Sequence, residues 1–302
     1  MKTMAESFDI SPAEQIIAAK KKKRIKKICT ASVNYFFLVV IGIALMFPAL
    51  VMLLQSFMTR DEAMSLPAKL FPDGFQISNY LSIFESRYLL MFGNTFKIVL
   101  INLLAVPLTS SLCAYAFARL DFKGRELIFA IVLATMMLPG VVTQIPTYIL
   151  YSKIGLLNTH IALWLPSFGG GAVNIFLVRQ FMRGIPKEID NAAKIDGANR
   201  FRIYWNIVLP MTVPVLIYIG VAVFTATWND FQGPLMYLSA SGAEKYTLSL
   251  GLYYDFGKGG PFEIEKQKQM AIGVVMSIFP AVLFLVFQRY LIEGVSMGAV
   301  KG

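Results

Sequence analysis

Side chains able to do chemistry are sparse in this sequence and do not fall into catalytic or metal-binding spacings. The one histidine, His160, and the two cysteines, Cys29 and Cys113, are far apart in the chain, which predicts two free thiols and no metal site. The apolar stretches contain no carboxylate pair, no Ser/His/Asp set and no Gly-x-x-x-x-Gly-Lys phosphate loop. We therefore expect no catalytic residue and no bound metal or cofactor, which argues against an enzyme.

Uncharged polar residues within or beside the apolar stretches are the second kind of candidate. Their amide and hydroxyl groups could hydrogen-bond a neutral, hydroxylated solute, and could equally tie neighbouring helices together. The same stretches lack the Asp, Glu, His or Arg relay typical of proton- or voltage-driven membrane proteins. The polar residues are Asn102, Thr109, Ser110, Ser111, Gln144, Asn174, Thr225, Thr227 and Asn229.

Six apolar stretches must position these residues. The chain has 302 residues, of which 56% are hydrophobic, and its mean hydropathy is +0.61, which indicates a polytopic membrane protein. Each stretch is near the ~20 residues that cross a ~30 Å hydrocarbon core, and backbone groups in lipid must be satisfied within a helix. The predicted fold class is therefore all-α with six transmembrane helices. The stretches cover 33–57, 94–117, 127–150, 161–180, 207–228 and 270–290.

Prolines and glycines interrupt most of these stretches. Proline removes a backbone donor and kinks a helix, whereas glycine lets helices approach closely or break. Such interruptions suit a bundle that moves or lines a path better than a simple anchor. The prolines are Pro48, Pro107, Pro139, Pro146, Pro166, Pro214 and Pro280, and the glycines are Gly169, Gly170 and Gly171.

The net charge of +10 falls on one side of the predicted bundle. With the N-terminus inside, the inside segments are 1–32, 118–126, 179–206 and 289–302. They carry 19 of the 28 Lys and Arg residues and nine of the 18 acids. The positive-inside rule therefore predicts that both termini are cytosolic, and the charge needs no nucleic acid to explain it.

The N-terminal part combines a possible helix with a basic cluster. The run KKKKRIKK from Lys20 to Lys27 is interpreted as a topology anchor, with binding of anionic membrane lipid as the alternative. A short helix at the membrane surface is expected over 11–19.

A charged segment over 188–210, EIDNAAKIDGANRFRIYWNIVLP, separates the fourth and fifth apolar stretches. A helix-forming cytosolic segment of this length is expected to meet another protein. The Asp196-Gly197 step should turn the chain between two short helices, because glycine accepts a left-handed backbone. Asn191, Ala192 and Ala193 place small side chains on the first helix, which would let a partner approach closely.

The spacing in this segment resembles the EAA loop of ABC importer permeases. That signature is Glu-Ala-Ala, three residues, Gly, nine residues, Ile, any residue, Leu-Pro. Asn191 departs from the usual glutamate, which weakens any expectation of a salt bridge from this position. The positions in register are Ala192, Ala193, Gly197, Ile207, Leu209 and Pro210.

Shorter motifs narrow the resemblance to permease subunits of carbohydrate importers of the maltose group. The likeness covers nearly the whole chain from about residue 33. The motifs are Phe71-Pro72 with Asn79-Tyr80, Phe122-Lys123-Gly124, Trp228-Asn229-Asp230-Phe231 with Pro234-Leu235, and the tail Gly-Ala-Val-Lys-Gly.

The resemblance implies a permease subunit of an ATP-driven, binding-protein-dependent sugar importer in a bacterial cytoplasmic (inner) membrane. It implies a second homologous permease, two ATPase subunits that bind ATP and Mg²⁺, and an extracytoplasmic sugar-binding protein. The implied organisation is a basic segment over 1–32, a permease domain over 33–290 and a cytosolic tail over 291–302. The 188–206 helix would dock in an ATPase subunit.

The predicted sites follow from the motifs and from the polar residues together. The residues of the charged segment are assigned to ATPase coupling, and residues within or beside the apolar stretches are assigned to the substrate path. The C-terminal tail is expected to reach the ATPase interface. The sets are Asn191, Ala192, Ala193, Asp196, Gly197, Ala198, Ile207, Leu209 and Pro210 for coupling; Gly298, Ala299, Val300, Lys301 and Gly302 for the tail; and Gln144, Asn174, Trp228, Asn229 and Asp230 for the path.

Two alternatives stay open on sequence grounds. A permease for another solute, such as glycerol phosphate, should favour basic residues along the path, and the second to fifth stretches offer few. A secondary transporter or channel should carry an ion-coupling carboxylate or a selectivity ring, and neither is visible in the sequence.

Overall fold

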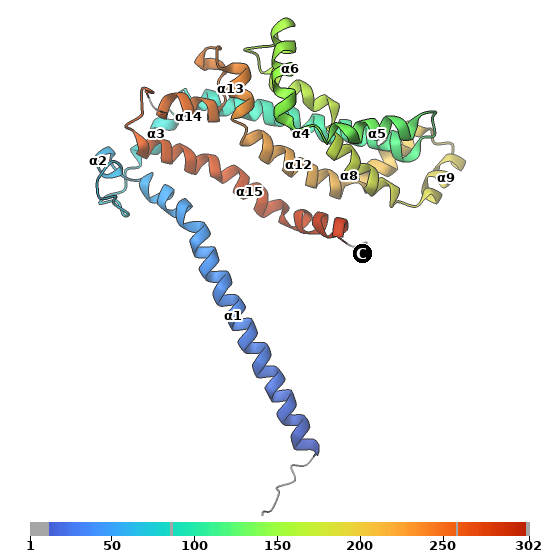
Figure 1. The fold of residues 1–302 in the computed structure, drawn as a ribbon, viewed down its shortest axis with the longest axis horizontal. Coiled ribbons are helices and arrows are strands. Elements are labelled where there is room, and N and C mark those ends of the chain that lie inside the picture. Colours follow the sequence, from blue (N-terminus) through green and yellow to red (C-terminus); the bar gives the residue numbers. More distant parts are fainter. Residues whose placement is uncertain (1–11, 85–86, 258, 300–302) are drawn as a thin grey trace, which may run out of the picture. The chain divides into compact units, whose positions relative to one another are not determined.

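The computed structural model describes residues 12–84, 87–257 and 259–299, and these residues form helices and connecting loops without a strand. The chain divides into two compact units, residues 1–54 and 55–302. Figure 1 shows the helices of both. The prediction of an all-α chain is confirmed.

The first unit holds almost all of helix α1, Pro12–Gln55. Its part from Lys26 to Gln55 is long and apolar enough to cross a membrane. Phe36, Leu38 and Leu45 are 64%, 63% and 76% exposed, as expected of a helix that meets lipid. Because Pro12 is compatible with a first helical turn and no further proline follows before Pro48, the described part of the helix expected over 11–19 is the beginning of α1.

Helix α4, Tyr88–Arg119, is the central element of the second unit. It packs along α8 (Ala172–Arg183) and α12 (Val213–Trp228), and α12 packs on α15 (Lys266–Ala299). Figure 1 shows α4, α12 and α15 running side by side.

Two apolar clusters lie towards opposite ends of α4. One contains Tyr115 together with Met182 and Tyr204. The other contains Phe92 together with Trp228 and several residues of α14 and α15. Both clusters bury aromatic and aliphatic side chains between helices that are distant in sequence, which fixes the course of α4.

The third predicted span is two helices rather than one. Helices α5 (Arg125–Thr135) and α6 (Gly140–Lys153) are together long and apolar enough to span a membrane, but they are bent by 97° relative to each other. Pro139 caps α6, and a residue before proline disfavours the helical backbone. Pro139 is one of the prolines expected to interrupt the stretch over 127–150, and the chain breaks there.

The fourth and fifth spans are also interrupted. The fourth comprises α7 (Ile161–Trp164), a 3₁₀ turn over Leu165–Gly169, and α8. The fifth begins with α10 (Arg200–Ile203), a π-helical turn over Tyr204–Val208 and α11 (Leu209–Met211), and bends by 73° before α12. Within the described ranges, four helices are long and apolar enough to span a membrane by themselves, and up to six spans result if each bent pair crosses once.

Gly170 explains how the fourth span approaches α4. Its φ is +71°, and a Cβ there would lie 2.8 Å from the backbone nitrogen of Ser110 and 2.9 Å from its Cα. Only a glycine combines this left-handed backbone with this closeness. The sequence prediction that the glycine run permits close approach therefore applies to Gly170.

Short helices occupy the two longer connections. The first connection holds α2 (Arg60–Ala63) and α3 (Ser78–Phe84), and the second holds α13 (Gln232–Leu238), a 3₁₀ turn over Ala243–Lys245, and α14 (Leu248–Phe256). Buried Asn79 donates to the carbonyls of Ser56 and Met58, both at 2.9 Å. Its amide therefore fixes α3 against the chain that follows α1.

Candidate functional site

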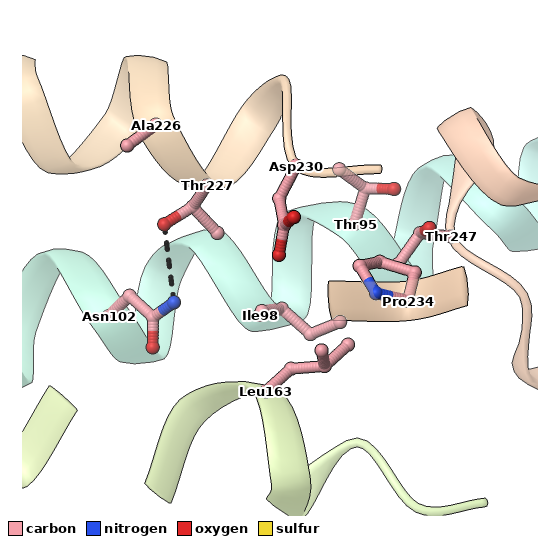
Figure 2. Close-up of a pocket in the computed structure, with 9 residues that line it drawn as sticks. All are labelled: Thr95, Ile98, Asn102, Leu163, Ala226, Thr227, Asp230, Pro234 and Thr247. Carbon is pink, nitrogen blue, oxygen red and sulfur yellow. Dashed lines mark hydrogen bonds between the residues drawn. The ribbon is translucent and has the colours of Figure 1, made fainter. Parts of the chain in front are cut away.

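A cavity of about 270 Å³ lies between α4, α7, α12 and the segment that follows α12. Figure 2 shows side chains from all four converging on it. Its wall mixes aliphatic side chains with hydroxyl, amide and carboxylate groups, and it contains no Lys, Arg or His. The lining residues are Thr95, Ile98, Asn102, Leu163, Ala226, Thr227, Asp230, Pro234 and Thr247.

Asn102 joins the helices around the cavity. Its Nδ2 donates to Thr227 Oγ1 at 3.2 Å, and its Oδ1 accepts from Ser167 Oγ at 2.8 Å. One amide therefore connects α4 to α12 and to the 3₁₀ turn of the fourth span. Polar residues are expected either to tie helices together or to contact a solute. The Asn102 amide ties helices together and also lines the cavity.

Asp230 supplies the one carboxylate of the cavity wall. Figure 2 shows this carboxylate directed into the space between α4 and α12. Its Oδ1 accepts from the backbone N–H of Gly233 at 3.0 Å, which holds the side chain at the start of α13. Burial raises the pKa of Asp230 above its usual value, and the backbone donors of Gly233 and Gln232 oppose that shift.

The other four residues predicted for the substrate path do not line this cavity. Gln144 accepts a hydrogen bond from Gln232 at 3.0 Å, and Asn174 donates to the carbonyl of Gly170 at 3.0 Å. Asn229 is exposed and donates to the carbonyl of Thr225 within its own helix. Among the five predicted path residues, only Asp230 belongs to the cavity wall.

Trp228 is placed in the protein interior. It is 1% exposed, stacks on Phe224, packs against Phe96 and donates from Nε1 to the carbonyl of Met276 at 3.2 Å. The side chain therefore belongs to the apolar cluster between α4, α12 and α15.

Sequence reasoning had not assigned Thr95, Ile98 and Thr247 to the path. Thr95, Ile98 and Asn102 follow one another at helical spacing, so they share one face of α4. That spacing was a usable signal. Thr247 comes from the long loop before α14, and only the folded chain brings it to the same wall.

The segment from α9 to α11 forms a second candidate site, which we call the connecting segment (187–211). Helix α9, Lys187–Ile195, ends at a turn in which Gly197 has a φ of +80°. Asn199 then caps α10 by accepting from the backbone N–H of Arg202 at 2.8 Å. The predicted turn at Asp196-Gly197 is thus present between two helices.

The connecting segment presents an apolar surface. Ile195 is 87% exposed, Phe201 67% and Trp205 49%, and the rings of Phe201 and Trp205 stack. Exposed apolar side chains this close together mark interaction surfaces. A groove of about 210 Å³ lies beside them, lined by Ala193, Asp196, Ala198, Arg202, Asn206 and Ile207.

The residues predicted for coupling divide between the surface and the interior. Asn191, Ala192, Asp196, Gly197 and Pro210 are exposed, and Ala198, Ile207 and Leu209 are half-buried.

Ala193 is 7% exposed and packs in the cluster with Tyr204. Its small size serves packing within this chain, and it also lines the groove beside the exposed apolar surface. Of the predicted tail contact at Gly298 to Gly302, residues 300–302 lie outside the described residues.

Neither the histidine nor the two cysteines belong to a possible metal site within the described residues. His160 Nε2 lies 2.8 Å from the carbonyl oxygen of Lys245, and Cys29 and Cys113 are free thiols. Across the described ranges, no three His, Cys, Asp or Glu residues are grouped so that they could hold a metal ion.

Comparison with known proteins identifies similar chains. The family model described as "Binding-protein-dependent transport system inner membrane component" matches residues 106–297. The arabinooligosaccharides transport system permease protein AraQ of Halalkalibacterium halodurans is 35% identical over 262 residues, covering 85% of this chain and 91% of the relative. The probable starch degradation products transport system permease protein AmyC of Thermoanaerobacterium thermosulfurigenes is 31% identical, covering 87% of this chain and 94% of the relative.

A solved structure has a similar fold. It is a chain of a bacterial ABC transporter involved in the import of the acidic polysaccharide alginate, with a TM-score of 0.75 and 20% sequence identity. The match covers 94% of this chain and 99% of that chain.

Proposed function

The chain belongs to the family of binding-protein-dependent transport system inner membrane components, and from this premise we propose that it forms half of the pathway of an ATP-driven oligosaccharide importer. Its role is transport, and chemical catalysis belongs to other chains. The proposed second half is a homologous permease subunit, and the proposed energy source is a pair of ATPase subunits that bind ATP and Mg²⁺. A sugar-binding protein would deliver the substrate.

The observation that carries this proposal is the exposed surface of the connecting segment. Ile195 is 87% exposed between the fourth and fifth membrane spans, and Phe201, which is 67% exposed, lies in the first turn of the fifth span. In the sequence, the same segment lies on the side that carries the excess of Lys and Arg. An apolar surface in a polar connection is best explained by a protein that covers it, and we assign it to the ATPase on the cytosolic side.

The cavity supports a neutral sugar as the substrate class. Its wall offers hydroxyl, amide and carboxylate groups to sugar hydroxyls and contains no cation for a phosphate or a uronate. The half-buried Asp230 carboxylate would repel an anionic solute. Relatives named for arabinooligosaccharides and starch degradation products point to the same class.

The test is reconstitution of the whole transporter from its native membrane. We expect mild-detergent purification of this chain to recover a second permease and an ATPase, and vesicles containing them to accumulate a neutral oligosaccharide when ATP and the binding protein are supplied. The control is the same complex with ADP. Recovery of the chain alone, with flux that follows an ion gradient and ignores ATP, would contradict the proposal.

A further inference from the structure

Arg119, the last residue of α4, contacts two other helices at once. Its Nη2 donates to the carbonyls of Met182 and Ile185, both at 2.8 Å. Its Nη1 lies 3.4 Å from Oδ2 of Asp190. The first contact reaches the end of α8, and the second reaches the first turn of α9.

The end of α8 and the side chain of Asp190 both favour a cation here. The last carbonyls of a helix lack partners within the helix, and the helix dipole makes that end negative. Asp190 adds a full negative charge at the beginning of α9. Arginine suits this position because its planar guanidinium offers several donors in fixed directions.

The ion pair lies inside the protein. The side chains of Arg119 and Asp190 are 3% and 10% exposed. Within the described residues, Nε of Arg119 and Oδ1 of Asp190 have no hydrogen-bond partner. The pair is therefore shielded from solvent, and separating its two charges would leave each of them buried without an opposite charge.

Helix α9 has few other attachments to its own chain. Asp190 and Ala193 are its buried residues, and Ile195 at its end is exposed. In the described part of the chain, α9 shares no extended face with another helix. By contrast, α4 packs firmly along α8 and α12 and lines the cavity with Thr95, Ile98 and Asn102.

We propose that Arg119 is the positioning residue that transmits a displacement of α9 to α4, and through α4 to the cavity. This inference rests on the proposed function, in which an ATPase moves α9. The inference concerns a contact within this chain, separate from the surface that would bind the ATPase. We call this contact the Arg119 joint: its guanidinium holds the end of α4, the end of α8 and the start of α9 together, so that the three move as one body.

The first test measures coupling in the reconstituted transporter. Asp190→Asn keeps the size of the side chain and removes its charge, and Arg119→Gln removes the cation. We expect both to keep the ATPase bound and to lower the sugar imported per ATP hydrolysed about tenfold, within the usual range of coupling effects. Arg119→Lys should give an intermediate value, because it keeps the charge but not the three-way reach.

The matched control is Arg125→Gln. Arg125 lies six residues further along the chain, and its contact with Asp121 is on the surface, since the Asp121 side chain is 97% exposed. The substitution removes the same charge, and we expect normal coupling.

The second test measures the joint directly. Spin labels at Lys194 in α9 and Leu104 in α4, with both native cysteines replaced, report the distance between the two helices. We expect that distance to stay constant between ATP-free and ATP-bound complexes and to change with ATP in Asp190→Asn. If the distance responds to ATP in the same way in the unsubstituted transporter and in Asp190→Asn, the inference is overturned.

Failure of the proposed role of Arg119 and failure of the proposed function give different results. Normal import per ATP in Asp190→Asn and Arg119→Gln would overturn the role of Arg119. Loss of both variants from the membrane would assign the pair to folding and would also overturn it. Failure of the unsubstituted complex to import with ATP would instead count against the proposed function.

Discussion

The amide of Asn102 donates to the hydroxyl of Thr227 at 3.2 Å and so joins α4 to α12 beside the cavity. Figure 2 shows this bond at the edge of the cavity wall. Interhelical hydrogen bonds in membrane proteins contribute on average about 0.6 kcal/mol, with larger values where a partner is left unsatisfied. The bond is thus a modest stabiliser at the wall of the cavity that we propose takes the substrate.

Thr227→Val should therefore lower the thermal stability of the detergent-solubilised protein by an amount equivalent to about 1 kcal/mol. Thr225→Val is the matched control, because the Thr225 hydroxyl donates only to the Val221 carbonyl of its own helix. Thermal unfolding of the two variants side by side gives the comparison. Equal stability of both would show that the Asn102 contact contributes nothing measurable.

Gly170→Ala should destabilise the protein far more than Gly169→Ala does. The new Cβ would meet the backbone of Ser110 at 2.8 Å in a left-handed conformation, and backbone strain of this kind costs about 1–3 kcal/mol before the clash is added. Gly169→Ala, where nothing lies within 4 Å of the added Cβ, is the control. Membrane abundance and melting temperature should fall for Gly170→Ala alone, and equal values would mean that α8 can move away from α4 freely.

Ile195→Asp should separate the ATPase from the transporter without unfolding this chain. Ile195 is 87% exposed, so its replacement leaves the interior intact, whereas a charge on a covered apolar surface carries a large desolvation cost. We expect less ATPase in pull-downs and less ATP-driven uptake at unchanged membrane levels. Unaltered uptake would remove the docking assignment from this end of α9.

Two other substitutions in the connecting segment should uncouple hydrolysis from uptake, although for different reasons. Gly197→Pro cannot adopt the φ of +80° at the turn. Ala193→Trp would overpack the cluster around Tyr204. Uptake and ATP hydrolysis measured together check both, and normal uptake at normal membrane levels would contradict the importance of the turn.

Asp230→Asn should reduce uptake of a neutral sugar. A hydrogen bond to a charged acceptor contributes about 1.5–3 kcal/mol, so loss of the charge predicts a decrease of about tenfold or more in apparent affinity. Asn229→Ala is the control, since the Asn229 amide is exposed and bonds within its own helix. Transport measured against substrate concentration should show the change in Asp230→Asn only.

The loop after α1 should be insensitive to mild acid. Backbone N–H groups of Thr59 and Asp73 donate to the Glu62 carboxylate and, with Lys69, lower its pKa from 4.5 to about 2. Because the folded pKa is depressed, the stabilisation is fully present above about pH 4.5 and is lost as the pH falls towards 2. Protease cleavage within 59–76 should therefore be the same at pH 7 and pH 5, and higher in Glu62→Gln. A marked rise at pH 5 in the unsubstituted protein would contradict this.

Much of the architecture followed from the sequence because the membrane imposes it. Apolar runs long enough to cross a bilayer must be helices, since lipid offers no partner for backbone groups. The spacing of Gly197, Ile207 and Pro210 identified the connecting segment through its resemblance to a known family signature, and the left-handed turn at Gly197 is a local property of the chain. These are local rules, and local rules can be read along a chain.

The cavity and the joint at Arg119 were decided only by the tertiary structure. Thr95, Asp230 and Thr247 come from separate elements, and no spacing along the chain indicates that they share a wall. Trp228 and Ala193 are in recognisable motifs, yet packing turns both inward. Burial of the Arg119 and Asp190 charges likewise depends on α4, α8 and α9 meeting at one point. The sequence by itself determined that the long apolar segments are helical and that the chain turns at Gly197, whereas the packing of distant helices decided which side chains line the cavity, lie on the surface or contact one another.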